Sequence, residues 1–210
     1  MIKVVPFIYE DLDDLYANTY VLIDGKKQCV VIDPAKANQS INSYIKKNEL
    51  HLKAVLLTHG HMDHMRGVDT IINEFHCPLY MGFYDMDKLT DPFSNCSLFL
   101  GEEMIIKSMP ETVSEKRVLN LLEEDIQIFE TPFHTSGSVC FYLKDSHLLF
   151  TGDFLFAGSI GRSDLPSAQP RELSKSMRKI LVLPKETKIY PGHGKSTTIE
   201  TELRSNPYVK

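Results

Sequence analysis

Short runs of apolar residues recur along the chain, separated by polar residues that favour turns. Because these runs are rich in β-branched and aromatic side chains, they predict strands rather than helices. The predicted strands are Tyr20–Ile23, Cys29–Ile32, Ala54–Leu57, Leu79–Met81, Ile126–Phe129, Val139–Leu143, Leu148–Phe150 and Lys188–Tyr190. The first two strands flank a short polar stretch, as do Val139–Leu143 and Leu148–Phe150, so each pair is expected to form a hairpin.

Apolar residues at helical spacing predict helices in three other segments, Asn38–Lys47, Val68–Phe75 and Arg171–Leu183. Residues 84–125 show no clear period, and for them we expect one helix and a long loop. Hairpins mixed with strand–helix units indicate a layered α/β protein with a mixed sheet. No repeat or Pro/Gly/Ser-rich linker divides the chain, so residues 1–210 are expected to form a single domain.

Composition narrows the classes of function. Lys and Arg total 23 against 28 Asp and Glu, which gives a net charge of -5 and an isoelectric point near 5.9. The chain therefore lacks the excess of basic residues that is typical of a protein that binds nucleic acid or an anionic membrane surface. No apolar run approaches the roughly 20 residues that cross a bilayer, and the opening MIKVVPFIYE is unlike a secretory signal. Four scattered cysteines fit reduced thiols, so we expect a cytoplasmic protein.

Three of the eight histidines stand in one short string, THGHMDH, at residues 58–64. His59 and His61 are two residues apart at the end of a predicted strand, so their side chains point to the same side. Asp63 and His64 follow where the chain turns toward the next predicted helix, and they can face the same point from another direction. Imidazole and carboxylate together are ligands for zinc or a similar ion, so the string predicts a metal site.

Three more candidate ligands, His134, Asp153 and His193, each follow a predicted strand. Polar groups at the ends of neighbouring strands converge at one edge of a sheet, where layered α/β folds place their sites. Seven ligands are too many for one tetrahedral ion. They suit two ions, one held by three imidazoles and the other by a carboxylate and two imidazoles, with a second carboxylate bridging. Two ions about 3.5–4 Å apart can share a hydroxide that attacks a carbonyl or phosphoryl centre.

The chain resembles the metallo-β-lactamase superfamily and, within it, the glyoxalase II-like hydrolases. The resemblance covers most of the chain, fades across residues 84–125, and rests on THGHMDH, TPFHTSGSV (131–139), TGDFLFAGSIGRSDLP (151–166) and YPGHGKSTTIETE (190–202). It implies an αββα sandwich of two mixed β-sheets flanked by helices. The chain is similar to the short, single-domain members, because only 17 residues follow His193 and the C-terminal helical domain that contacts glutathione in longer enzymes is not expected.

The resemblance also implies a site for two divalent metal ions, with zinc expected first and iron or manganese as alternatives. The implied ligands are His59, His61 and His134 for the first ion, Asp63, His64 and His193 for the second, and Asp153 as the bridge.

Enzymes that the chain resembles hydrolyse thioesters such as S-lactoylglutathione, so the implied partner is a small acyl-thiol substrate. A hydroxide between the two ions would attack the thioester carbonyl, and Asp63 would orient that hydroxide as well as bind metal. A thiol with a pKa of about 8.5 can leave as a thiolate, so the lack of an evident general acid in these motifs fits the reaction.

Three residues near the motifs are expected to affect substrate binding. Phe133 stands where relatives usually have glycine, and it would strain its loop if φ is positive, or reshape the pocket wall. Arg66, also in place of glycine, is expected either to attract an anionic substrate at the pocket mouth or to begin the helix in solvent. Arg162 would form an ion pair with Asp164 under the site or contact the substrate.

Two alternatives use only part of this pattern. A mononuclear iron persulfide dioxygenase of the same fold would need only His59, His134 and Asp153, the two-histidine, one-carboxylate set suited to iron and oxygen. The string SIGRSDLP at residues 159–166 is more similar to the hydrolases. A scaffold that binds a partner without metal would be expected to lose ligands, whereas the full set is present. The sequence therefore favours the thioester hydrolase.

Overall fold

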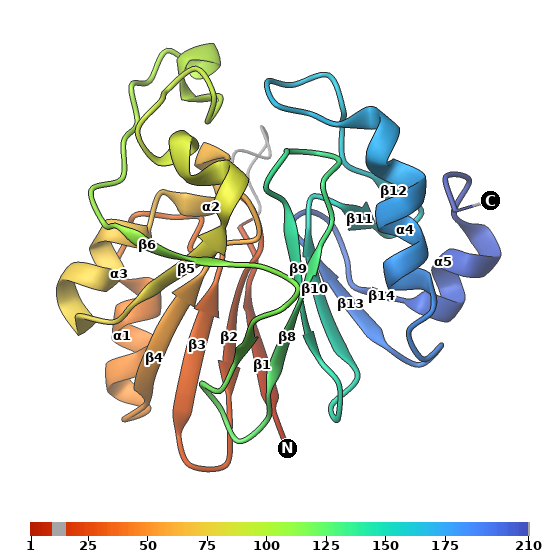
Figure 1. Cartoon of the computed structure of the whole chain (residues 1–210). Helices are drawn as coiled ribbons and strands as arrows, with labels where there is room; N and C mark the ends of the chain where they lie inside the picture. The colour runs from red at the N-terminus through yellow and green to blue at the C-terminus, as the bar shows by residue number, and fades with distance from the viewer. Residues whose placement is uncertain (10–15, 210) are drawn as a thin grey trace.

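The structure is a computed structural model and describes residues 1–9 and 16–209. Within these residues, two six-stranded β-sheets lie face to face and helices cover their outer faces (Figure 1). Both sheets contain parallel and antiparallel pairs. The αββα sandwich implied by the resemblance is confirmed.

The first sheet has the strand order β1-β2-β3-β4-β5-β6. Its strands are β1 (Lys3–Phe7), β2 (Thr19–Ile23), β3 (Gln28–Ile32), β4 (His51–Leu56), β5 (Leu79–Gly82) and β6 (Pro110–Val113). The first three strands are antiparallel neighbours, because β2 and β3 form the predicted hairpin. From β3 to β6 the neighbours are parallel. Parallel neighbours need crossover connections, which place α1 (Ser40–Lys47) and α3 (Val68–Phe75) against this sheet.

The second sheet has the order β14-β13-β10-β9-β8-β7. Its strands are β7 (Val118–Leu119), β8 (Ile126–Glu130), β9 (Val139–Leu143), β10 (Leu148–Gly152), β13 (Lys188–Pro191) and β14 (Thr197–Thr198). β8, β9 and β10 form an antiparallel meander, and β13 pairs parallel with β10. As a result β8, β10 and β13 all end on the same side of the sheet. A short ribbon, β11 (Leu155–Phe156) with β12 (Ser159–Ile160), follows β10.

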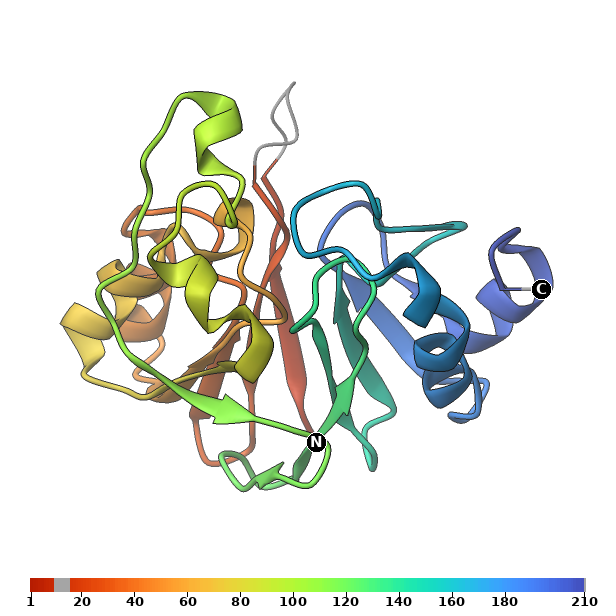
Figure 2. The same cartoon turned by 45° about the horizontal axis from the view of Figure 1, so that its top comes forward.

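The remaining helices lie outside the second sheet or around the loops at one end of the sandwich (Figures 1 and 2). They are α2 (Met62–Met65), η1 (Phe83–Leu89), η2 (Ser97–Leu100), η3 (Pro170–Glu172), α4 (Leu173–Leu181) and α5 (Ile199–Ser205), where η marks a 3-10 helix. None of the helices in the described part of the chain is both long enough and apolar enough to cross a bilayer.

The central strands are buried on both faces, which explains why their sequences are apolar runs rather than alternating patterns. In β2, Leu22 points into the layer between the sheets, where it joins Phe141 of the second sheet. Its neighbour Val21 points outward and packs in the layer that holds Ile41 of α1 and Ile71 of α3. A third apolar layer lies between the second sheet and α4.

The structure of residues 84–125 differs from the single helix and long loop expected from the sequence. This segment holds most of η1, all of η2, and the two strands β6 and β7. A 3-10 helix has three residues per turn, so it lacks the 3.6-residue period that marks an α-helix in sequence. β1 was not predicted because it is an edge strand that contains Pro6 and keeps partly exposed positions. The predicted helix Arg171–Leu183 is divided between η3 and α4.

Candidate metal centre

The seven predicted ligand residues lie together at one end of the sandwich, where the two sheets meet. They follow the carboxyl ends of β4, β8, β10 and β13 (Figures 1 and 2). Since β8, β10 and β13 end on the same side, the loops after them face the loop after β4. The residues form two groups, His59, His61 and His134 in one, and Asp63, His64, Asp153 and His193 in the other.

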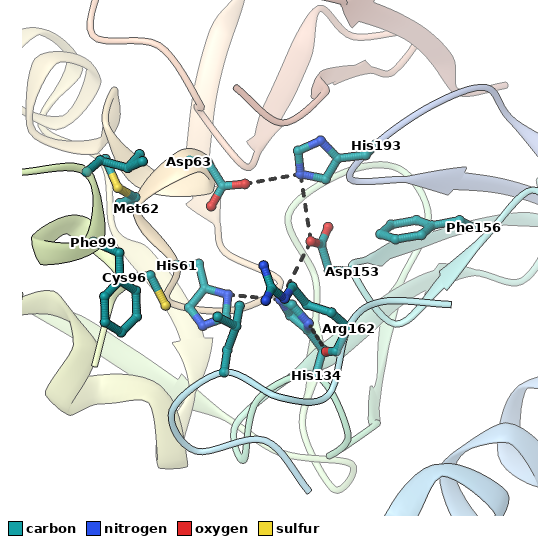
Figure 3. A pocket seen from close by; sticks show the side chains of 12 residues that line it. His61, Met62, Asp63, Cys96, Phe99, His134, Asp153, Phe156, Arg162 and His193 are labelled. Atoms are coloured by element: carbon teal, nitrogen blue, oxygen red, sulfur yellow. Dashed lines mark hydrogen bonds and ion pairs between the residues drawn. The ribbon is translucent and has the colours of Figure 1, made fainter. Parts of the chain in front are cut away.

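The first group consists of three buried histidines. Its ligand atoms lie within 4.8 Å of one another, and His61 Nδ1 is 2.9 Å from His134 Nε2 (Figure 3). His59 Nε2 and His61 Nε2 are buried and have no hydrogen-bond partner among the described residues. Buried polar atoms normally have a partner, so these nitrogens indicate a missing one. Three imidazoles around one point are a donor set that suits zinc.

The second group combines two carboxylates and two imidazoles, whose ligand atoms also lie within 4.8 Å of one another. His193 Nε2 is 3.1 Å from Asp63 Oδ2, and His64 Nε2 is 3.1 Å from Asp153 Oδ1. Nitrogen and oxygen donors of this kind fit zinc, iron or manganese. Both groups therefore fit a metal ion.

Asp153 faces both groups. Its Oδ1 approaches His64, whereas its Oδ2 lies 3.6 Å from His134 Nε2 and 3.7 Å from His193 Nε2 (Figure 3). This is the position that a bridging carboxylate would need. Gly192 makes the approach feasible, because a Cβ atom there would stand 2.2 Å from Asp153 Oδ1. Close packing therefore requires glycine at this position.

Asp33, directly after β3, orients two of the ligand residues from behind. Its carboxylate accepts hydrogen bonds from the Thr58 amide (2.8 Å) and the Thr58 hydroxyl (2.7 Å). The same carboxylate lies 2.9 Å from His64 Nδ1, so His64 Nε2 is turned toward Asp153. Thr58 Oγ1 also lies 3.2 Å from His59 Nδ1. Such outer partners fix the ring orientation of metal ligands.

Asp85 joins the loops that carry the first group. It lies in η1, is fully buried, and accepts hydrogen bonds from the Gly60 amide (3.0 Å) and the Gly137 amide (2.8 Å). It also accepts one from the Thr135 hydroxyl (2.7 Å). Lys88 Nζ is 3.0 Å from Asp85 Oδ1, and both side chains are inaccessible to solvent. One buried carboxylate thus holds the loop after β4 and the loop after β8 together.

The two groups differ in proton affinity. Burial and the neighbouring histidines hold the pKa of His59 well below its ordinary value. Burial together with the nearby His134 lowers the pKa of His61 to about 3. These two rings are neutral at neutral pH, which is the state in which imidazole binds metal.

In the second group the carboxylates reverse this effect. Burial opposes protonation of His193, but attraction to Asp153 and a hydrogen bond with Asp63 outweigh it and raise its pKa to about 9. The pKa of His64 is likewise raised well above its ordinary value, because Asp153 and Asp63 outweigh its burial. In the metal-free protein both rings are therefore protonated at neutral pH.

This difference predicts the pH dependence of metal binding. A metal ion in the second group must displace protons from His64 and His193, so its affinity should rise between pH 6 and 9, by about tenfold per pH unit for each proton released. His59 and His61 release none in this range. Calorimetric titration of metal-free protein with zinc, in buffers of different ionisation enthalpy, measures the protons released by each ion. Equal proton release by the two ions would contradict this prediction.

A cavity of about 480 Å³ opens over the two groups (Figure 3). It is lined by His61, Met62, Asp63, Cys96, Phe99, Leu100, His134, Asp153, Phe156, Arg162, Leu165 and His193. Five of the predicted ligands therefore face a space that can accept a small molecule, whereas His59 and His64 lie behind them.

Of the three residues expected to affect substrate binding, only Arg162 lines the cavity. Its guanidinium forms a two-bond ion pair with Asp164 at 2.7 Å, exposed at the rim rather than under the site. Arg66 is paired with Glu102 at 2.5 Å instead. Phe133 is 2% exposed, has no positive φ, and packs edge-on against Phe154 in the layer beside α4. It neither strains its loop nor forms the pocket wall.

The site residues predicted from the sequence do not include Asp33, Asp85 and Lys88. Asp33 carried a signal, since it follows the predicted strand Cys29–Ile32 as the other polar site residues follow theirs. Asp85 and Lys88 lie in the segment without a period, and nothing in their local sequence indicates burial. Only the folded structure places them beside the ligand loops.

Comparison with known proteins decides the family. The family model described as "Metallo-beta-lactamase superfamily" matches residues 12–193. The chain belongs to the metallo-beta-lactamase superfamily. Among members of this superfamily, the probable metallo-hydrolase YqgX of Bacillus subtilis (strain 168) is 36% identical over 197 residues, which are 93% of this chain and 93% of YqgX. Hydroxyacylglutathione hydrolase GloC of Haemophilus influenzae is 33% identical over 91% of this chain and 92% of GloC.

Solved structures of the superfamily agree with this fold. The structure of BLEG-1 B3 metallo-beta-lactamase has a TM-score of 0.90 and 34% identity, and covers 100% of this chain and 99% of that one. TTHA1623 in a di-iron-bound form has a TM-score of 0.83 and 31% identity, and covers 97% and 99%. Together with the two candidate metal sites, these relatives identify the chain as a metal-dependent hydrolase of the metallo-beta-lactamase superfamily.

Proposed function

We propose that this protein hydrolyses thioesters in the manner of glyoxalase II, using two divalent metal ions. The observation that carries the proposal is the complete pair of ligand groups beneath one cavity, with Asp153 facing both. His59, His61 and His134 would hold one ion and Asp63, His64 and His193 the other. Two bound ions would polarise the carbonyl oxygen and lower the pKa of water. The similarity to GloC supports a thioester substrate.

The residues that line the cavity suit a substrate whose leaving group departs without receiving a proton. Asp63 extends into the cavity and is about a quarter exposed, so its carboxylate can accept a hydrogen bond from the attacking water. Beyond the proposed ligands, the described lining residues with an N–H or S–H group are Arg162 and Cys96. The hydrogen bond with Asp164 raises the pKa of the Arg162 guanidinium, which therefore keeps its proton. Burial raises the pKa of Cys96 to about 11, so it is a weak acid. A thiolate leaves without a proton, whereas the amine of an opened lactam needs one, so the site favours thioesters.

The dioxygenase alternative uses fewer of these residues. It would need His59, His134 and Asp153 and would leave the ligand atoms of Asp63 and His193 without a role. The structural arrangement of the second group therefore supports the hydrolase.

Metal content and activity test the proposal together. Protein purified without chelator should contain about two metal ions per chain and should hydrolyse acyl-thiols, measured by release of free thiol. His59→Ala should remove a ligand of the first ion and abolish most of this activity while the circular dichroism spectrum stays unchanged. His51→Ala, an exposed histidine at the start of β4, is the matched control.

A content of one iron ion per chain, together with oxygen consumption when a persulfide is added, would contradict the hydrolase and favour the dioxygenase. Hydrolysis of a β-lactam but of no thioester would also contradict the proposal.

A further inference from the structure

The cavity over the candidate metal centre has apolar side chains on both flanks. Phe99 and Leu100 of η2 line one flank, with Met62 and Cys96 beside them. Phe156 of β11 lines the other, and Leu165 is a further apolar residue of the lining. In Figure 3, Phe99 lies beside His61 and Phe156 lies beyond Asp153 and His193, on the opposite side. A substrate group that extends toward Phe99 or toward Phe156 therefore meets apolar side chains.

The first flank remains exposed although it is apolar. Phe99 is 55% exposed and Leu100 is 50% exposed, and the ring of Phe93 extends the patch 5.6 Å from the ring of Phe99. A contiguous apolar patch that is open to water, at the mouth of a cavity, indicates a surface that an apolar group covers.

This flank is held in place rather than loosely attached. The buried Asn95 donates hydrogen bonds to the carbonyls of Lys88 and Met104, both at 2.9 Å, and its side-chain oxygen accepts one from the Ser97 amide. The Asn95 carbonyl accepts a further bond from the Met62 amide, at the start of α2. The apolar wall is thus preformed and anchored directly to the string that carries Asp63 and His64.

No unpaired Lys or Arg lines the cavity in the described part of the chain. Arg162, the one Lys or Arg among the lining residues, is engaged by both carboxylate oxygens of Asp164. Arg66 lies outside the lining and is engaged by Glu102. Residues 10–15, outside the described part, have the sequence EDLDDL and contain no basic residue. Glutathione carries two carboxylates, and the described lining offers them no unpaired Lys or Arg.

We propose that the substrate is a thioester with apolar, uncharged groups on both sides of its carbonyl, such as a medium-chain acyl group on a small neutral thiol. The inference rests on the proposed thioester hydrolysis and names its substrate class. Phe99 and Leu100 act as specificity-determining residues that cover the acyl chain. Burial of each methylene contributes about 0.8 kcal/mol, which corresponds to about a fourfold gain in affinity.

The first test compares two thiols and several chain lengths with the metal-loaded enzyme. Acetyl to octanoyl thioesters of N-acetylcysteamine should show kcat/KM rising by up to about fourfold per methylene. Hexanoyl-N-acetylcysteamine should exceed both hexanoylglutathione and S-lactoylglutathione by at least about tenfold. Phe99→Ala should flatten the dependence on chain length. Leu98→Ala is the matched control, because Leu98 lies in the same short helix but outside the cavity lining.

The second test does not need turnover. Binding of the hexyl thioether of N-acetylcysteamine and of S-hexylglutathione to metal-free protein is measured by calorimetry, and the neutral thioether should bind at least about tenfold more tightly. Preference for the glutathione compounds in either test, or no effect of chain length, would overturn the inference and leave thioester hydrolysis standing. If the two-metal enzyme hydrolyses no thioester, the proposed function fails, and a binding preference for S-hexylglutathione would reject the apolar cavity as well.

Discussion

Replacing Asp153 by asparagine should weaken both metal sites at once. The substitution keeps the shape of the side chain but removes the charge that faces both groups, at 3.1 Å from His64 and 3.6 Å from His134. Loss of an outer partner of a metal ligand typically lowers affinity 10- to 100-fold, so loss of a shared ligand should lower both affinities by at least about 100-fold. Elemental analysis after dialysis against a weak chelator should show both ions reduced, with activity lost in parallel.

Asp145→Asn is the control for this experiment, because Asp145 is an exposed carboxylate in the turn between β9 and β10. It should keep two ions and full activity. Loss of one ion only from Asp153→Asn, with the other bound as in the wild type, would contradict the bridging role.

Replacing Asp85 by alanine should be the most destabilising single change outside the ligands. Three hydrogen-bond donors would lose their acceptor. Among the described residues, the buried ammonium group of Lys88 would keep only one carboxylate nearby, that of Asp87 at 3.6 Å. Removing one partner of a buried ion pair costs about 3–5 kcal/mol. Urea unfolding of the metal-free protein measures this loss. Because the loops of the first group separate, zinc affinity there should also fall.

Asp87→Ala is the matched control, since Asp87 lies in the same helix but its side chain is 63% exposed. Its unfolding free energy should stay within about 0.5 kcal/mol of the wild-type value. If Asp85→Ala does not fold, Asp85→Asn with Lys88→Met removes both charges and should regain part of the stability. Unchanged unfolding of Asp85→Ala would show that the buried pair does not support the loops.

The parts of the fold that could be predicted from sequence are those with a local signal. The strands β2, β3, β9 and β10 are short apolar runs with turn residues between them, and α3 begins and ends where its pattern does. The seven predicted ligand residues stand out in the sequence because histidine and aspartate recur at the ends of predicted strands. Their convergence follows from strand direction, a property that the sequence pattern indicates only indirectly.

The parts that could not be predicted depend on contacts between distant segments. A lysine in a sequence normally indicates an exposed position. Lys88 is buried because its ammonium group pairs with Asp85 in the same helix, and the surrounding loops cover both side chains. The sequence leaves two places open for Arg66, the pocket mouth or a helix start in solvent. Neither includes its partner Glu102, which is 36 residues away. The single domain and the cytoplasmic location stay predictions.

Each ligand group draws on both sheets. His59 and His61 come from the loop after β4, whereas their partner His134 comes from the loop after β8. The second group likewise joins the string after β4 to the loops after β10 and β13. A bound ion would therefore act as a cross-link between the two layers of the sandwich. When the free metal concentration is 1,000 times the dissociation constant, one such ion adds about 4 kcal/mol to the free energy of unfolding. The supply of metal in the cell would then govern how long the folded chain survives proteolysis.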